Sequence, residues 1–369
     1  MKKKVFKVIL LGFMMFVMIG KLGAQNTKTT ADDIKKAIGL SVYVQAGFTF
    51  NLRNPFSQTN EQRAFDQKSN SFSLDLVQIQ FAKEAEKGGL GFKFLLSAGE
   101  TAKFIHSTGL GLTNEPFDLT QGYLEYIAPV GNGLKFTIGK FVTFFGAEVI
   151  EAKDNIMYSR SILFFYAIPF THTGLKMDYS FSDAISLGLY VVNGWDNALD
   201  NNKGKTFGVS LGVEPIKALS MYFNFMIGPE QNNNSSDNRL LFDWVATITP
   251  VKALTISLNV DYGQEDKATA TLGKAKWYGF AGIVKYQITS MFSLAARGEF
   301  FNDEGGTRIV FGTAQKMKEI TITPEVIVAK GLILRGEYRH DWSDQLVFNL
   351  NSTPKKTQDT VSLSAMYTW

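Results

Sequence analysis

Apolar and polar residues alternate in short segments along almost the whole of this 369-residue chain. In residues 254–262 every even position is apolar or aromatic and every odd position is polar. Successive side chains of a β-strand point to opposite faces, so each such segment is predicted to be a strand with one apolar face. Beyond Ile19 no apolar run approaches the roughly 20 residues that a membrane-spanning helix needs. If the chain enters a membrane, it must therefore do so as a closed β-barrel.

Segments of this kind recur at regular intervals, and each has about ten residues, the length with which a tilted strand crosses a bilayer. We count sixteen of them, at residues 40–52, 71–83, 89–100, 117–128, 134–143, 173–181, 185–193, 205–214, 219–228, 239–249, 254–263, 276–287, 292–302, 318–328, 332–342 and 358–369. In residues 71–83 the apolar set moves from even to odd positions, which predicts a β-bulge in that strand.

The connections between these segments alternate in length. Short turns fall at residues 84–88, 129–133, 182–184, 215–218, 250–253, 288–291 and 329–331. Long polar loops fall at residues 53–70, 101–116, 144–172, 194–204, 229–238, 264–275, 303–317 and 343–357. Outer-membrane barrels have short periplasmic turns and long extracellular loops. A soluble β-sandwich has no reason to sort its connections in this way. The predicted fold is therefore all-β, a transmembrane antiparallel β-barrel of about 16 strands.

The first residues resemble a secretory signal peptide. In residues 1–24, lysines precede an apolar run at 8–19, and a Leu-Gly-Ala sequence follows at 22–24. Residues 25–39 are predicted to form a short periplasmic leader with helix signals after Thr30, and residues 40–369 to form the barrel.

Composition excludes two classes of function. The signal segment holds five of the 38 basic residues and no acid, which leaves 33 basic against 34 acidic residues. A nucleic-acid partner is not expected, because phosphate binding needs a clustered positive surface. The chain has no Cys, which excludes thiol catalysis and Cys-ligated metals.

Three short motifs carry little chemistry. Residues 208–212 match G-x-S-x-G, but Ser210 lies in the middle of a predicted strand rather than on a strand-to-helix turn. His106, His172 and His340 are isolated, so no metal site is predicted. Loop 194–204 contains Asp196 and Asp200 without the spacing of a calcium loop, and calcium binding there is left open. No cofactor is predicted.

The long loop at residues 144–172 is unusually apolar, with Phe144, Phe145 and the run from Leu163 to Tyr166. Exposed apolar residues would be a liability, so we expect this loop to fold into the barrel and narrow the lumen. Its charged residues are candidate constriction residues, namely Glu148, Glu151, Asp154 and Arg160.

The opposing wall is predicted to be basic. Arg297, Arg335 and Arg339 lie on the lumen-facing parity of their strands. Loop acids opposite these arginines would lay a transverse field across the narrowest point of the pore. Glu299 and Glu337 share that wall and could pair with the arginines instead, and a mixed polar wall without a constriction is the alternative.

The central third of the chain resembles the OmpL-like family of β-barrel porins. The matching stretches are residues 120–134, 139–143, 145–149, 158–161, 168–174, 191–197 and 228–231, with Asn155. Trp369 also resembles the terminal aromatic insertion signal of outer-membrane barrels, at a position where Phe is commoner. The resemblance implies porin-like transport and no catalytic residues.

The predicted function is a passive aqueous channel for small hydrophilic solutes in the outer membrane of a Gram-negative bacterium. Its partners would be outer-membrane lipid and the solutes, and a homotrimer is compatible with this interpretation. The alternatives are a barrel hydrolase that uses His172 or His340 with a nearby hydroxyl, and a structural or adhesive barrel with a closed lumen.

Overall fold

The computed structural model describes residues 39–111, 114–268, 273–351 and 353–369. The predicted signal peptide at 1–24 and almost all of the predicted leader at 25–39 lie outside these residues. In the part of the chain that is described, no helix is long and apolar enough to cross a membrane.

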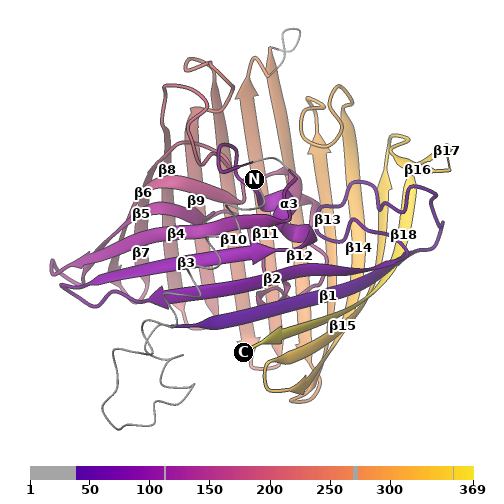
Figure 1. Cartoon of the computed structure of the whole chain (residues 1–369), viewed down its shortest axis with the longest axis horizontal. Helices are drawn as coiled ribbons and strands as arrows, with labels where there is room; N and C mark the ends of the chain where they lie inside the picture. Colours follow the sequence, from indigo (N-terminus) through magenta and orange to yellow (C-terminus); the bar gives the residue numbers. More distant parts are fainter. Residues whose placement is uncertain (1–38, 112–113, 269–272, 352) are drawn as a thin grey trace, which may run out of the picture. The chain divides into compact units, whose positions relative to one another are not determined.

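Sixteen antiparallel strands form one closed barrel, in which each strand pairs with its neighbour along the chain (Figure 1). The barrel closes where β1 pairs with β18 through Val44 and Tyr367. The strands are β1 (Ser41–Asn51), β2 (Ser71–Lys83), β3 (Leu90–Ala98), β4 (Phe117–Ala128), β5 (Leu134–Val142), β6 (Thr171–Ser182), β7 (Ile185–Val192), β8 (Thr206–Ile216), β9 (Leu219–Pro229), β10 (Asn238–Val251), β11 (Leu254–Asp266), β12 (Lys274–Gln287), β13 (Phe292–Asp303), β14 (Gln315–Ala329), β15 (Leu332–Ser343) and β18 (Thr357–Thr368).

The predicted fold is confirmed, because each of the sixteen predicted segments corresponds to one strand of the barrel. The predicted bulge is also present. The register of β1 against β2 shifts between Gln45 and Ala46, which leaves Asp75 as an extra residue on β2. The shift explains why the apolar parity changes within that strand.

The connections are short at one end of the barrel and long at the other. The turns at 217–218 and 252–253 have two residues each, whereas the longest loop occupies residues 143–170 between β5 and β6. The long connections hold the remaining elements, which are α3 (Glu100–Ile105), η1 (Ala152–Asp154), α4 (Ile162–Tyr166) and the hairpin of β16 (Phe348–Leu350) with β17 (Thr353–Lys355).

The two faces of the wall differ in polarity. On β11, Val260 and Tyr262 are exposed on the outside, whereas Asn259 and Asp261 are buried on the inside. Outward-facing side chains on other strands, such as Leu124 on β4, are likewise large, apolar and exposed. Alternation along each strand therefore gives the barrel an apolar outer surface and a polar inner wall.

The hydrophobic core lies within the barrel and comes largely from the long loops. Ile150, Ile162, Leu163 and Phe164 of the loop between β5 and β6 are almost completely buried and belong to one cluster. Phe65 from the loop between β1 and β2 joins the same cluster. Burial of these side chains is the force that draws the loops inward.

Candidate pore constriction

The loop at residues 143–170, which we call the inner loop, is a folded unit. The side chain of Asn155 accepts from Val149 N at 2.8 Å and donates to Val149 O at 2.7 Å, which closes a small ring of backbone. Arg160 Nε also donates to Val149 O, at 3.1 Å. Ser161 begins α4 as its N-cap, because its hydroxyl accepts from Phe164 N at 3.0 Å.

Two acids of the barrel wall bind the backbone of the inner loop. Glu337 on β15 accepts from Tyr158 N at 3.0 Å and from Ser159 N at 3.1 Å. Glu299 on β13 accepts from Ile162 N at 2.6 Å and from Leu163 N at 3.2 Å. Both carboxylates therefore satisfy buried N–H groups of a loop segment that has no strand partner.

The predicted arginines bind the same loop. Arg297 on β13 donates to Glu148 Oε1 at 2.9 Å and to Glu319 Oε1 at 2.6 Å. Arg339 on β15 donates through Nη1 to Arg160 O at 2.6 Å and through Nε to Asp341 at 2.8 Å.

Arg335 binds more backbone oxygens of the loop than Arg297 or Arg339 does. It donates to the backbone oxygens of Ala152, Asn155 and Met157 at 2.6–2.8 Å and to Glu325 at 2.8 Å. Five donors in a planar guanidinium suit this task, because one side chain can satisfy several carbonyl groups of an irregular loop.

These contacts revise the predicted arrangement of charges. Among the described residues, one ion pair joins an acid of the inner loop to a base of the wall, namely Glu148 with Arg297. The side chain of Glu151 accepts from Gln78 Nε2 at 2.6 Å, and the exposed Asp154 pairs with Lys153. The three wall arginines are almost completely buried and bind loop backbone or wall acids. They fasten the loop and do not form an open row of charge across a gap.

Arg160 was predicted to line the pore as a charged group, but its guanidinium is used within the protein. It donates to the backbone oxygens of Tyr158 and Ile150 and lies 4.7 Å from the ring centre of Phe65. A buried arginine in these surroundings holds the turn of the loop closed.

The loop between β1 and β2 also enters the barrel, and its role could not be recognised from the sequence. Arg63 forms ion pairs with Asp66 of its own loop and with Asp341 on β15, where Nη2 and Oδ2 lie 2.5 Å apart. The ring of Phe65 lies 5.7 Å from that of Phe164 on α4. The available signals were Phe65 in a mainly polar loop and the opposite charges of Arg63 and Asp66, three residues apart.

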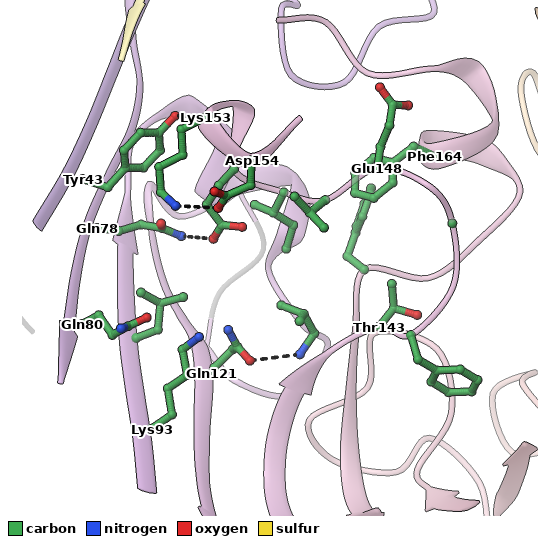
Figure 2. Close-up of a pocket in the computed structure, with 18 of the residues that line it drawn as sticks. Tyr43, Gln78, Gln80, Lys93, Gln121, Thr143, Glu148, Lys153, Asp154 and Phe164 are labelled. Atoms are coloured by element: carbon green, nitrogen blue, oxygen red, sulfur yellow. Dashed lines mark hydrogen bonds and ion pairs between the residues drawn. The ribbon is translucent and has the colours of Figure 1, made fainter. Parts of the chain in front are cut away.

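A cavity of about 400 Å³ with a mixed polar and apolar lining remains between the inner loop and the wall formed by β1 to β5. Figure 2 shows Gln78, Gln80 and Lys93 of the wall on one side of this cavity, with Lys153 and Asp154 of the loop close to Gln78, and Glu148 and Phe164 on the other side. Among the predicted constriction residues, only Glu148, Glu151 and Asp154 line it.

A second cavity of about 340 Å³ lies on the other side of Phe144, against β6 to β10. Phe144 stacks on Tyr190 with their ring centres 3.7 Å apart. Ser186, Ser210 and Asn224 supply polar groups to its lining.

The sequence motifs at 193–197 and 228–231 meet at the long-loop end. Glu230 accepts from Trp195 N at 2.8 Å and from Thr206 Oγ1 at 2.6 Å. Gly194 has φ +119°, and a Cβ there would come within 2.4 Å of the Glu230 carboxylate, so only glycine fits. Burial raises the pKa of Glu230 to about 7, although the positive charge of Arg239 opposes the shift.

The acids of loop 194–204 have structural partners. Asp196 accepts from Phe170 N at 2.9 Å and from Thr171 N at 2.8 Å, and Asp200 pairs with Lys205. Within the described residues, no group of three or more His, Asp or Glu side chains is placed to hold a metal ion.

The motifs considered for hydrolysis are placed as follows. His172 Nε2 lies 3.1 Å from Thr143 Oγ1 and its Nδ1 lies 3.0 Å from Gly194 O, and the side chain is completely buried. His340 Nδ1 lies 2.7 Å from Asp359 on the outer surface. Ser210 lies in the middle of β8, so the elbow that its motif requires is absent there.

A closed sixteen-strand barrel with a polar wall and an inward-folded loop is the architecture of a porin-like barrel. The chain belongs to the family described as "Putative beta-barrel porin-2, OmpL-like", whose model matches residues 37–369. No curated protein matches the chain in sequence.

Solved outer-membrane barrels have the same fold. The outer membrane channel DcaP of Acinetobacter baumannii aligns with a TM-score of 0.62 at 11% identity, over 89% of this chain and 96% of that chain. The anion-selective porin from Comamonas acidovorans aligns with a TM-score of 0.61 at 9% identity, over 89% and 98%. OmpF of Salmonella typhi, in complex with daunomycin, aligns with a TM-score of 0.60 at 12% identity, over 89% and 97%. At these identities the likeness is one of fold.

Proposed function

We propose that the chain is an outer-membrane porin of a Gram-negative bacterium that passes small hydrophilic solutes by passive diffusion. The observation that carries the proposal is the cavity between the inner loop and the wall of β1 to β5, whose lining includes charged and amide side chains. Membership of the OmpL-like porin family and the fold of channels such as DcaP support it.

The outer surface supports insertion into lipid. Large apolar side chains cover the outside of the barrel, and strand pairing around the closed wall satisfies the backbone, as hydrocarbon surroundings require. The short turns are proposed to lie in the periplasm and the long loops outside the cell, as in other outer-membrane barrels.

The proposed path runs beside the inner loop rather than through the middle of the barrel. Amide groups of Gln78, Gln80 and Gln121 and the ammonium of Lys93 offer hydrogen bonds along one side of the cavity. Glu151, which accepts from Gln78 Nε2 at 2.6 Å, and Asp154 of the inner loop add acceptors to the lining. Such a lining replaces part of the hydration of a small polar solute, while the fastened loop limits the solute's size.

A barrel with a closed lumen is the second candidate, and one observation favours it. The apolar cluster of the inner loop, which includes Phe145, Ile162 and Leu163, fills space that a wide channel would leave open. Of the two candidates, the porin accounts better for the charged and amide groups that line the cavity.

Assembly into a homotrimer belongs to the same proposal. The trimer form of OmpT from Vibrio cholerae has the same fold, with a TM-score of 0.59 at 12% identity. Chemical cross-linking of the barrel in native membranes tests it, since a trimer gives a ladder that ends at three subunits.

Reconstitution into planar bilayers tests the channel function directly. A porin produces discrete, steady steps of conductance in KCl, whereas a closed structural barrel inserts without steps. A liposome-swelling assay with sugars of increasing size then measures the exclusion limit. Silence in both assays, with circular dichroism confirming a folded barrel, would reject the channel.

A further inference from the structure

Three polar residues of neighbouring strands lie in one row across the inner wall. The strand register pairs Asn224 on β9 with Asp243 on β10, and Asp243 with Asp261 on β11. All three side chains are at most 1% exposed. The row lies beside the start of the inner loop, because Gly146 N donates to Asp243 Oδ2 at 3.2 Å.

The side-chain amides of Asn224 and of Asn259, which lies two residues before Asp261 on β11, both donate hydrogen bonds to Asp243. Asn224 Nδ2 donates to its Oδ2 at 2.7 Å, and Asn259 Nδ2 donates to its Oδ1 at 2.6 Å. Both carboxylate oxygens of Asp261 and the amide oxygen of Asn224 have no hydrogen-bond partner among the described residues. The carboxyl groups of Asp243 and Asp261 interact directly with each other, so in the absence of a cation one of them must hold a proton that the other accepts.

No basic side chain balances this charge. In the described part of the chain, no Lys, Arg or His nitrogen lies within 4.0 Å of either carboxylate, although every arginine of the β13 to β15 wall has an acidic partner. Two neighbouring buried carboxylates repel each other, so keeping both ionised costs much folding free energy unless a cation binds between them.

We propose that Asp243 and Asp261 hold a hard divalent cation such as Ca²⁺, with the amide oxygen of Asn224 as a further ligand. Carboxylate and amide oxygens are the ligands that Ca²⁺ prefers, and two carboxylates neutralise its charge. A cavity of about 340 Å³ lined by Asn224, Ser210 and Gly146 lies at the Asn224 end of the row, and it is the side from which the ion would enter. The proposed protein ligands are therefore the carboxylates of Asp243 and Asp261 and the amide oxygen of Asn224.

The ion would also stabilise the inner loop. It keeps Asp243 ionised, and the ionised carboxylate is the stronger acceptor for Gly146 N. Ala147 N donates to Asn259 Oδ1 at 3.2 Å, so a second loop contact depends on the same group of side chains. The inference concerns the wall and its loop, and it does not rest on the proposed channel activity.

Titration of the full chain with CaCl₂ tests the proposal, using protein purified in a neutral detergent and stripped with EDTA. We expect calorimetry to give one strong site per chain, and the unfolding temperature to rise with Ca²⁺. Asp261→Asn should weaken binding at least tenfold and remove the thermal effect. Asn224→Asp adds a carboxylate to the row and should tighten binding, which provides a test if the first variant does not fold.

Matched controls separate this site from other acids. Asp178→Asn removes a lumen-facing carboxylate that is already paired with Lys176, and Asp200→Asn removes an acid of loop 194–204 paired with Lys205. Both should bind Ca²⁺ as the wild type does. Equal binding by wild type and Asp261→Asn would overturn the proposal. So would a wild type that binds no Ca²⁺ while Asp261→Asn is more stable, because the pair would then share a proton.

Discussion

Arg297 on β13 and Glu148 in the inner loop form a buried ion pair in which Nη1 and Oε1 lie 2.9 Å apart. The same guanidinium donates to Ser159 O at 2.9 Å. One side chain therefore binds the inner loop at Glu148 and at Ser159, which are more than ten residues apart. Arg335 and Glu337 add further contacts to the backbone between these points. The position of the loop is therefore set by hydrogen bonds to the wall as well as by apolar burial.

Removal of the Arg297 guanidinium should destabilise the barrel. Arg297→Met leaves Glu148 buried without its cation and leaves Glu319 with Arg339 alone, and breaking a buried pair from one side costs about 3–5 kcal/mol. Urea unfolding in detergent, followed by tryptophan fluorescence, measures the loss. The double variant Arg297→Met with Glu148→Gln should recover part of it. A single variant as stable as wild type would show that the pair contributes nothing.

A charged side chain on the outer surface of β11 should destabilise the barrel. Val260 is exposed on the outside near the middle of its strand. Val260→Lys should cost about 2–4 kcal/mol of folding free energy in lipid vesicles, because lysine at the bilayer midplane must reach the interface. Ser186→Lys is the matched control, since Ser186 lines the second cavity and its substituent remains hydrated. Equal losses in the two variants would refute the assignment of inner and outer faces.

Glu230 should make stability depend on pH in a defined window. Its pKa is about 7 in the folded protein against an ordinary value of 4.5, so the folded state binds more protons between these values. Stability from this group is therefore complete below about pH 4.5, falls as the pH rises to about 7, and is flat above that. The difference amounts to about 3 kcal/mol.

Glu230→Gln mimics the protonated side chain and should remove this contribution. Unfolding free energies of wild type and variant, measured from pH 4 to pH 8, should diverge as the pH rises, with the variant more stable near neutrality. A constant difference across the range would mean that Glu230 does not titrate there.

The proposed orientation can be tested with epitope tags on intact cells. Tags inserted in the two-residue turns at 217–218 and 252–253 should be hidden from antibody, and a tag at 235–236 in an exposed loop should be labelled. Permeabilised cells provide the control, because all three tags should then react. Labelling of the first two on intact cells would invert the topology.

The strands could be predicted from the sequence because their signal is local. A period of two over about ten residues is imposed by the bilayer outside and water inside, and it needs no knowledge of pairing partners. The bulge at Asp75 could be predicted as well, because it moves the apolar residues of β2 from even to odd positions, which is also a local signal.

The partners of the lumen residues could not be predicted in this way. Asn259 lies on the inner face, as expected, but alternation alone would suggest that lysine is tolerated there. Its amide in fact joins Asp243 to the inner loop at Ala147, so Asn259→Lys should disturb the loop. Arg63 and Asp341 are 278 residues apart, and no local pattern connects them. Such contacts depend on how the loops fold inside the closed barrel.

We propose that the inner loop limits the pore, and shortening this loop is the most direct test. Replacement of residues 150–157 by two glycines removes the part of the inner loop that brings Glu151 and Asp154 to the cavity. The wall should stay folded, because its stability resides in the closed strand ladder. Single-channel recordings in KCl should then show a larger unit conductance than wild type. An unchanged conductance in a folded variant would contradict the account.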